Sequence, residues 1–154
     1  MDKLIDDLIK LAFAEDIGDG DHTTLCCIPE TAMGKSQLII KEDGVLAGVE
    51  MAKRIFHDFD PELKMTVFIQ DGAEVKKGDI AFVVEGKIQS LLQTERLMLN
   101  VMQRMSGIAT TTRKYAKALE GTKTHVLDTR KTTPGMRMIC LLYTSDAADD
   151  LIGV

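Results

Sequence analysis

The 154-residue sequence lacks three features that mark membrane, secreted and metal-binding proteins. No apolar run approaches the ~20 residues that a membrane-spanning helix needs. The first seven residues are acidic and amphipathic, a pattern typical of neither a signal peptide nor a transit peptide. The cysteines are an adjacent pair, Cys26 and Cys27, and a distant Cys140, which suits neither a disulfide framework nor a metal site. We therefore expect a protein of the reducing cytoplasm with no membrane partner.

What is present is an ordinary globular composition with unevenly distributed charge. Apolar residues make up 45% of the chain and charged residues 28%, as in soluble domains. Residues 1–95 carry 10 Lys and Arg against 19 Asp and Glu, whereas residues 96–137 carry 9 against 2. A local positive surplus in an acidic protein favours a focused anion site over a nucleic-acid surface. A basic helix face balanced by acidic neighbours explains the surplus equally well.

Apolar periodicity and turn residues predict a small α+β unit with an antiparallel sheet in the first part of the chain. The segments that form it are predicted helices over 3–14 and 49–59, and predicted strands over 35–41, 64–70 and 80–85. Between them, Gly18 to Asp21 is a predicted turn whose acidic side chains accept hydrogen bonds from backbone amides near Thr23 and Thr24. Asp43-Gly44 is typical of a hairpin turn.

A mostly apolar helix is predicted to begin at Ser90, where Ser90 to Gln93 fits a capping box, and to end at Ser106-Gly107. Its polar residues fall at spacings of three and four, which forms one stripe: Gln93, Arg96, Asn100 and Gln103. Such a stripe is either a plain solvent-facing surface or a rigid support from which Arg96 meets an anion. The sequence leaves both interpretations open.

After this helix, the pattern predicts another helix from about residue 108, closed by Gly121. A short strand over 124–127 is predicted next, followed by the polar run 128–135. In α/β barrels, polar residues that follow a strand are where binding chemistry collects.

Five stretches taken in order resemble the quinolinate phosphoribosyltransferases, also called carboxylating nicotinate-nucleotide pyrophosphorylases. They are residues 15–24, 71–79, 95–100, 106–110 and 128–135. Each stretch alone is a weak signal, but five in the right order are specific. The resemblance begins near residue 5 and stops after Met138.

The resemblance implies a fold, a reaction and a set of binding residues. The implied fold is an α+β N-terminal sandwich domain of hammerhead type over 1–106, followed by the truncated start of an α/β barrel over 107–139. In the family, the arginine matching Arg96 crosses a dimer interface into the partner's barrel. The residues matching Thr129, Arg130 and Lys131 help to bind quinolinate and phosphoribosyl pyrophosphate. Guanidinium groups suit these anions because they pair with carboxylate or phosphate through two parallel hydrogen bonds.

In the implied reaction, the pyridine nitrogen of quinolinate attacks the anomeric carbon of the donor as pyrophosphate leaves. Loss of CO₂ then gives nicotinate mononucleotide, a step in NAD biosynthesis. The resemblance further implies Mg²⁺ with the donor, a homodimer or higher homo-oligomer, and no nucleic-acid partner. It assigns no catalytic residue and no metal ligand within this chain.

Residues 140–149 resemble the translation of a transposase-type sequencing-library adapter, so we interpret 140–154 as an artefactual tail. The rest of the barrel has no counterpart here, and we expect the 154-residue chain itself to be inactive.

Two alternatives remain at this stage. A nicotinate phosphoribosyltransferase, or a relative associated with molybdenum transport, would share the fold. A biotinyl or lipoyl carrier module belongs to another class, because residues 71–79 resemble the turns of such domains. No modifiable lysine stands at the hairpin tip that a carrier requires.

Overall fold

The computed structural model describes residues 2–127, 129 and 131–140. The chain order begins with two helices, α1 (Asp2–Ile17) and α2 (His22–Cys27), and the strands β1 (Met33–Ile39) and β2 (Gly44–Val45). It continues through α3 (Val49–Phe59), β3 (Lys64–Val67), β4 (Glu74–Val75), β5 (Ile80–Lys87) and the long helix α4 (Ile88–Ala118). A helical turn at 137–140 closes the described part. None of the helices in the described part is long and apolar enough to cross a membrane.

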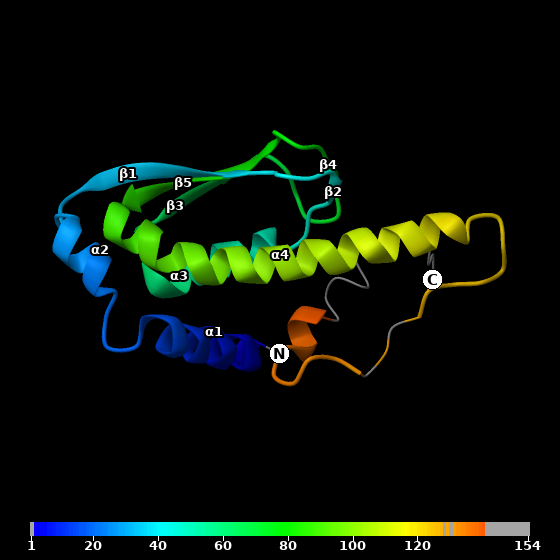
Figure 1. Cartoon of the computed structure of the whole chain (residues 1–154), viewed down its shortest axis with the longest axis horizontal. Helices are drawn as coiled ribbons and strands as arrows, with labels where there is room; N and C mark the ends of the chain where they lie inside the picture. The colour runs from blue at the N-terminus through cyan, green and yellow to red at the C-terminus, as the bar shows by residue number, and fades with distance from the viewer. Residues whose placement is uncertain (1, 128, 130, 141–154) are drawn as a thin grey trace.

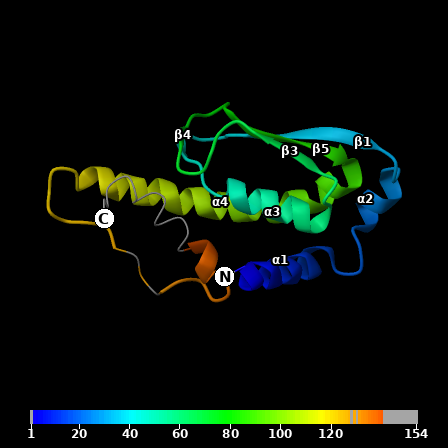
Figure 2. The ribbon, with the colours of Figure 1, turned by 180° about the vertical axis from the view of Figure 1, so that it is seen from behind.

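The fold has three layers, with the sheet on one side, α3 and α4 in the middle and α1 on the other side (Figures 1 and 2). The main sheet has the strand order β1-β5-β3, and both pairings are antiparallel. The short strands β2 and β4 pair separately. This α+β arrangement confirms the predicted fold class.

The core lies between the sheet and the two central helices. Phe82 and Val84 of β5 and Ile55 of α3 are almost completely buried there, and Phe82 meets Phe56 edge to face at a centroid distance of 6.2 Å. The predicted bounds of α3 are confirmed. Its C-terminal residue precedes Asp60, whose backbone N–H donates to the Phe56 carbonyl.

Helix α1 docks on the opposite side through a narrower contact. Ile5 and Ile9 are buried, and Arg54 of α3 donates from Nη2 to the Asp6 carboxylate at 2.6 Å. This docking fixes the helix that leads into the acidic turn at residues 18–21.

The predicted break at Ser106-Gly107 is wrong, because α4 runs unbroken for 31 residues. Ser106 is occupied by a tertiary contact, since its Oγ accepts from the Ala47 N–H at 3.0 Å and donates to the Ala47 carbonyl at 3.1 Å. A glycine inside a helix costs about 1 kcal/mol. The burial of Met105 and Ala109 on either side outweighs that cost.

The predicted capping box is also wrong. The helix begins two residues earlier, at Ile88. Its N-cap residue is Lys87, whose side chain makes no capping hydrogen bond. Ser90 lies inside the helix and donates to the Asp60 carboxylate at 2.6 Å. The side-chain amide of Gln93 donates to the Gln89 carbonyl, one helical turn earlier, and so does not cap the helix.

Two smaller predictions also differ from the structure. Asp43-Gly44 does not close a hairpin, because β2 pairs with the distant β4 and not with β1. The predicted strand at 124–127 is irregular backbone. Strand conformation in a barrel requires a hydrogen-bonding neighbour on each side, and no described strand lies beside this segment.

Candidate functional site

Arg96 lies in the N-terminal third of α4, on a helix whose opposite face is buried. Leu91, Met98 and Met102 anchor that face in the core, so the backbone that carries Arg96 is fixed. Three residues of the predicted polar stripe, Arg96, Asn100 and Gln103, are exposed, whereas Gln93 is half-buried.

The guanidinium of Arg96 is held by an acidic residue that lies 80 positions earlier in the sequence. Its Nη1 donates to Asp16 Oδ1 at 2.7 Å. The Asp16 side chain is 24% exposed, whereas that of Arg96 is 70% exposed. The Asp16 carboxylate, through this hydrogen bond and its charge, raises the pKa of Arg96 above its usual value. Arg96 therefore remains a fixed cation with most of its surface available to an anion.

The acidic turn that follows α1 shapes the surroundings of this pair. Gly18 has a φ of +57°, a conformation that favours glycine, and it reverses the chain. Asp21 Oδ1 then accepts from the Thr24 N–H at 3.1 Å and caps α2. Hydrogen bonds from the Thr24 side chain and backbone lower the pKa of the Asp21 carboxyl. The prediction that these acids bind backbone amides is confirmed at Asp21.

A cavity of about 240 Å³ lies beside Arg96. Its wall is polar and comes from three helices, through Asp16, Asp21, His22, Thr23, Gln93 and Arg96 among others. The cavity combines the Arg96 cation with two carboxylates, Asp16 and Asp21, and with hydroxyl and amide groups, so an anionic ligand would pair with the exposed part of the guanidinium, away from these acids.

The second predicted group lies in the segment that follows α4. Thr129 and Lys131 are exposed, and the Lys131 N–H donates to Thr129 Oγ1 at 3.3 Å. Asp128 and Arg130 lie outside the described residues. Figure 1 shows that this segment turns back beneath α4 after the helix ends. A hydrogen bond joins it to that helix, from Arg104 Nη2 to Thr133 Oγ1 at 2.8 Å.

The structure does not unite the two predicted groups in one pocket. The described residues that line the cavity at Arg96 all precede position 97, so neither Thr129 nor Lys131 contributes to it. The segment meets α4 at Arg104, through the hydrogen bond to Thr133, and Arg104 lies about 12 Å along the helix from Arg96. The expectation that Arg96 serves a partner's barrel requires no contact within one chain, and it stays a prediction.

Metal binding finds no support in the described residues, which contain no group of three or more His, Cys, Asp or Glu side chains arranged to hold a metal ion.

Sequence reasoning assigned Asp16 to the turn and missed it as the partner of Arg96. The two residues are 80 positions apart, so no local pattern joins them. The available signal was that both lie in stretches of the same family resemblance.

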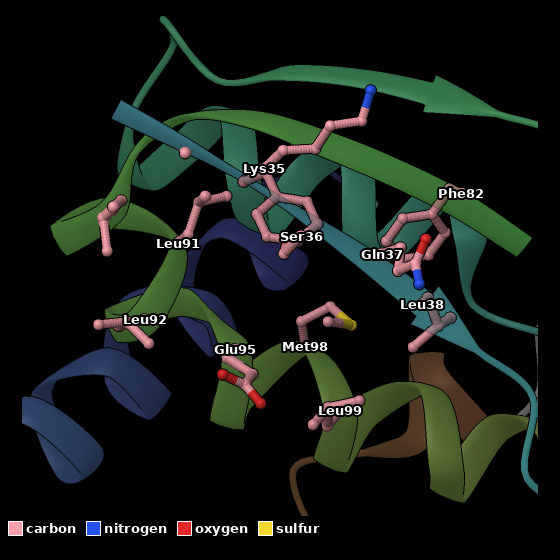
Figure 3. Close-up of a pocket in the computed structure, with 13 residues that line it drawn as sticks. Lys35, Ser36, Gln37, Leu38, Phe82, Leu91, Leu92, Glu95, Met98 and Leu99 are labelled. Atoms are coloured by element: carbon pink, nitrogen blue, oxygen red, sulfur yellow. The ribbon is translucent and has the colours of Figure 1, made fainter. Parts of the chain in front are cut away.

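A second concavity lies between β1 and the first turns of α4, with a volume of about 320 Å³. Figure 3 shows Phe82, Leu91 and Met98 forming its floor. Glu95 of α4 supplies a carboxylate at its rim, whereas the Lys35 side chain points away from the groove and pairs with Glu85. This groove is mainly apolar and contains none of the predicted substrate-binding residues.

Comparison with known families gives two matches in succession. The profile described as "Quinolinate phosphoribosyl transferase, N-terminal domain" matches residues 21–106, and the one described as its "C-terminal domain" matches residues 108–142. Among solved structures, NadC from Streptococcus pyogenes superposes with a TM-score of 0.92 at 35% identity, covering 96% of this chain and 53% of that one. The nicotinate-nucleotide pyrophosphorylase from Francisella tularensis gives 0.89 at 30% identity, with coverages of 96% and 53%.

Sequence relatives agree. Quinolinate phosphoribosyltransferase (decarboxylating) 1 of Nicotiana glauca is 45% identical over 133 residues, which is 86% of this chain and 37% of the relative. A probable nicotinate-nucleotide pyrophosphorylase (carboxylating) of Synechocystis is 40% identical over 136 residues, which is 88% of this chain and 46% of the relative. The chain thus spans less than half the length of these two relatives. Since one family profile alone covers more than half of its residues, the chain belongs to the quinolinate phosphoribosyltransferase family.

Proposed function

We propose that this chain is the N-terminal part of an enzyme that transfers a phosphoribosyl group from phosphoribosyl pyrophosphate to quinolinate. Decarboxylation then yields nicotinate mononucleotide, CO₂ and pyrophosphate. The observation that carries the proposal is the ordered match of both domains of the quinolinate phosphoribosyltransferase family. Arg96 falls inside the first matched region, and residues 129–131 fall inside the second.

In this proposal Arg96 pairs with a substrate carboxylate, while Thr129, Arg130 and Lys131 bind quinolinate and the phosphates of the donor. The geometry at Arg96 supports that role, because the guanidinium is fixed by Asp16 yet mostly exposed. Fixed cations near the leaving pyrophosphate would stabilise its charge. Within one chain neither Thr129 nor Lys131 lines the cavity at Arg96, so we further propose a homodimer in which Arg96 completes the partner's site.

Mg²⁺ enters with the donor in this proposal. We also propose a cytoplasmic location, which the free thiols of Cys26 and Cys27 support. The names of relatives vary on this point, because the rice relative is called chloroplastic and one tobacco relative mitochondrial. The 154 residues alone are proposed to lack turnover.

The test is a chimera in which residues 1–138 are joined to the part of Streptococcus pyogenes NadC that follows the position aligned with Met138. We expect nicotinate mononucleotide from quinolinate and the donor, and none from the 154-residue chain. Arg96→Ala should abolish most of the product, whereas Lys10→Ala, at an exposed position of α1, should leave it unchanged.

An active 154-residue chain would contradict the proposed division of the enzyme. A chimera that accepts nicotinate in place of quinolinate would favour the same-fold alternative.

A further inference from the structure

Cys26 and Cys27 are adjacent and exposed at the C-terminal end of α2. Both line one cavity of about 520 Å³, whose other walls come from Leu25, Ile28, Pro29, Glu30 and Gln89. The two thiols therefore share one open surface whose wall is apolar at Leu25, Ile28 and Pro29 and polar at Glu30 and Gln89. The third cysteine, Cys140, is 8% exposed and buried.

The element that carries the two thiols is fixed at both ends. Asp21 caps its start through the Thr24 N–H, and the Ile28 N–H donates to the Thr24 carbonyl at its end. The Gln89 amide of α4 donates to the Ile28 carbonyl at 2.7 Å, which ties the floor of the cavity to the long helix.

Neighbouring cysteines are poorly suited to a direct disulfide. Their Cα atoms are about 3.8 Å apart across a trans peptide, whereas disulfides usually join Cα atoms about 4.4–6.8 Å apart. An atom that bridges the sulfurs replaces the S–S bond by one bond to each sulfur, which enlarges the ring formed with the backbone and relieves this constraint. Soft thiol ligands select soft, thiophilic centres.

The number of ligands that the protein supplies decides which thiophilic atom the two thiols can bind. A structural zinc site requires four ligands, and no group of three His, Cys, Asp or Glu side chains is arranged for a metal in the described part of the chain. A trivalent organoarsenical requires only two sulfurs from the protein, because its third bond is to carbon. The apolar side chains of Leu25, Ile28 and Pro29 offer a surface for that organic group.

We propose that Cys26 and Cys27 form a vicinal dithiol site for trivalent organoarsenicals. In the binding step both S–H bonds break, two As–S bonds form, and the arsenic-bound oxygen leaves as water with the two thiol protons. No oxidant or reductant takes part. The site is independent of the proposed transferase activity.

The test uses phenylarsine oxide and the 154-residue chain, with intact-mass spectrometry under native conditions. We expect one phenylarsine per chain, retained in excess glutathione, a monothiol, and released by 2,3-dimercaptopropanol, a dithiol. Cys26→Ser and Cys27→Ser should each lose the arsenical, whereas Cys140→Ser should keep it.

A second measurement needs no substitution, so it tests the proposal even where a serine variant fails to fold. On the wild-type chain, phenylarsine oxide should block alkylation of the peptide that contains both thiols, and peptide mapping reads this directly. Unprotected Cys26 and Cys27, arsenical binding that survives either single serine variant, or release by glutathione would each overturn the proposal.

Discussion

The hydrogen bond between Ser90 and Asp60 offers a sharp test of how α4 is anchored to α3. Ser90 Oγ donates to Asp60 Oδ2 at 2.6 Å, and the two residues are 8% and 9% exposed. Asp60 Oδ1 separately accepts from the Glu62 N–H at 3.0 Å. The change Ser90→Ala removes one donor and leaves a buried carboxylate oxygen without its partner.

The expected change in the free energy of unfolding follows from two opposing contributions. A buried acceptor left unpaired costs about 1–3 kcal/mol, and alanine returns about 0.5 kcal/mol of helix propensity. We therefore expect Ser90→Ala to lower the free energy of unfolding by about 0.5–2.5 kcal/mol in urea titrations followed by circular dichroism. The control Ser36→Ala, at an exposed position of β1, should stay within about 0.5 kcal/mol of wild type. Equal stabilities of the two variants would refute the reasoning.

The same pair predicts a pH dependence. The Ser90 hydroxyl, followed by the Glu62 N–H and Lys87, holds the pKa of Asp60 below its usual value, although burial opposes them. A carboxyl whose folded pKa is depressed stabilises the fold above its unfolded pKa, about 3.9. That contribution is lost as the pH falls through the folded pKa. The difference between wild type and Ser90→Ala should be constant near neutral pH and should shrink below about pH 4.

The remaining predictions concern the core, a constrained glycine and the Arg96 site. Met105→Ala should lower the free energy of unfolding by about 2–5 kcal/mol, since Met105 is fully buried. Gly48→Ala should lower the midpoint of thermal unfolding more than Gly72→Ala does. Both glycines have a positive φ, but only at Gly48 would a Cβ lie 3.0 Å from the Met105 Cε. Asp16→Asn should weaken quinolinate binding by the chimera, since it frees the Arg96 guanidinium, while the unfolding transition of the chain stays near wild type. A quinolinate Kd unchanged in Asp16→Asn would show that Asp16 does not orient Arg96.

Local sequence signals predicted the elements whose physics is local. Helix α3 begins and ends where predicted, because a strongly amphipathic run ends at Asp60-Pro61. The alternating Met65 and Val67 likewise identified β3, although this strand ends at Val67 and not at Gln70.

Tertiary contacts decided the features that were mispredicted. Ser106 and Gly107 would end an isolated helix, yet Ser106 bonds to Ala47 and the flanking residues are buried. The Ser90 hydroxyl binds Asp60 instead of a helix terminus. Arg96 was identified from sequence, but its partner Asp16 was not, because 80 positions separate them. Whether residues 129–131 meet Arg96 across a dimer lies beyond one described chain and stays a prediction.

The most direct test of the central claim is the affinity of the chimera for quinolinate, measured by isothermal titration calorimetry. The account predicts tighter binding of quinolinate than of nicotinate. It also predicts that Arg96→Ala weakens quinolinate binding by about tenfold or more, as the loss of a charge-assisted hydrogen bond does, while Lys10→Ala binds as wild type. Equal affinity of wild type and Arg96→Ala for quinolinate would contradict the claim that this arginine meets the substrate.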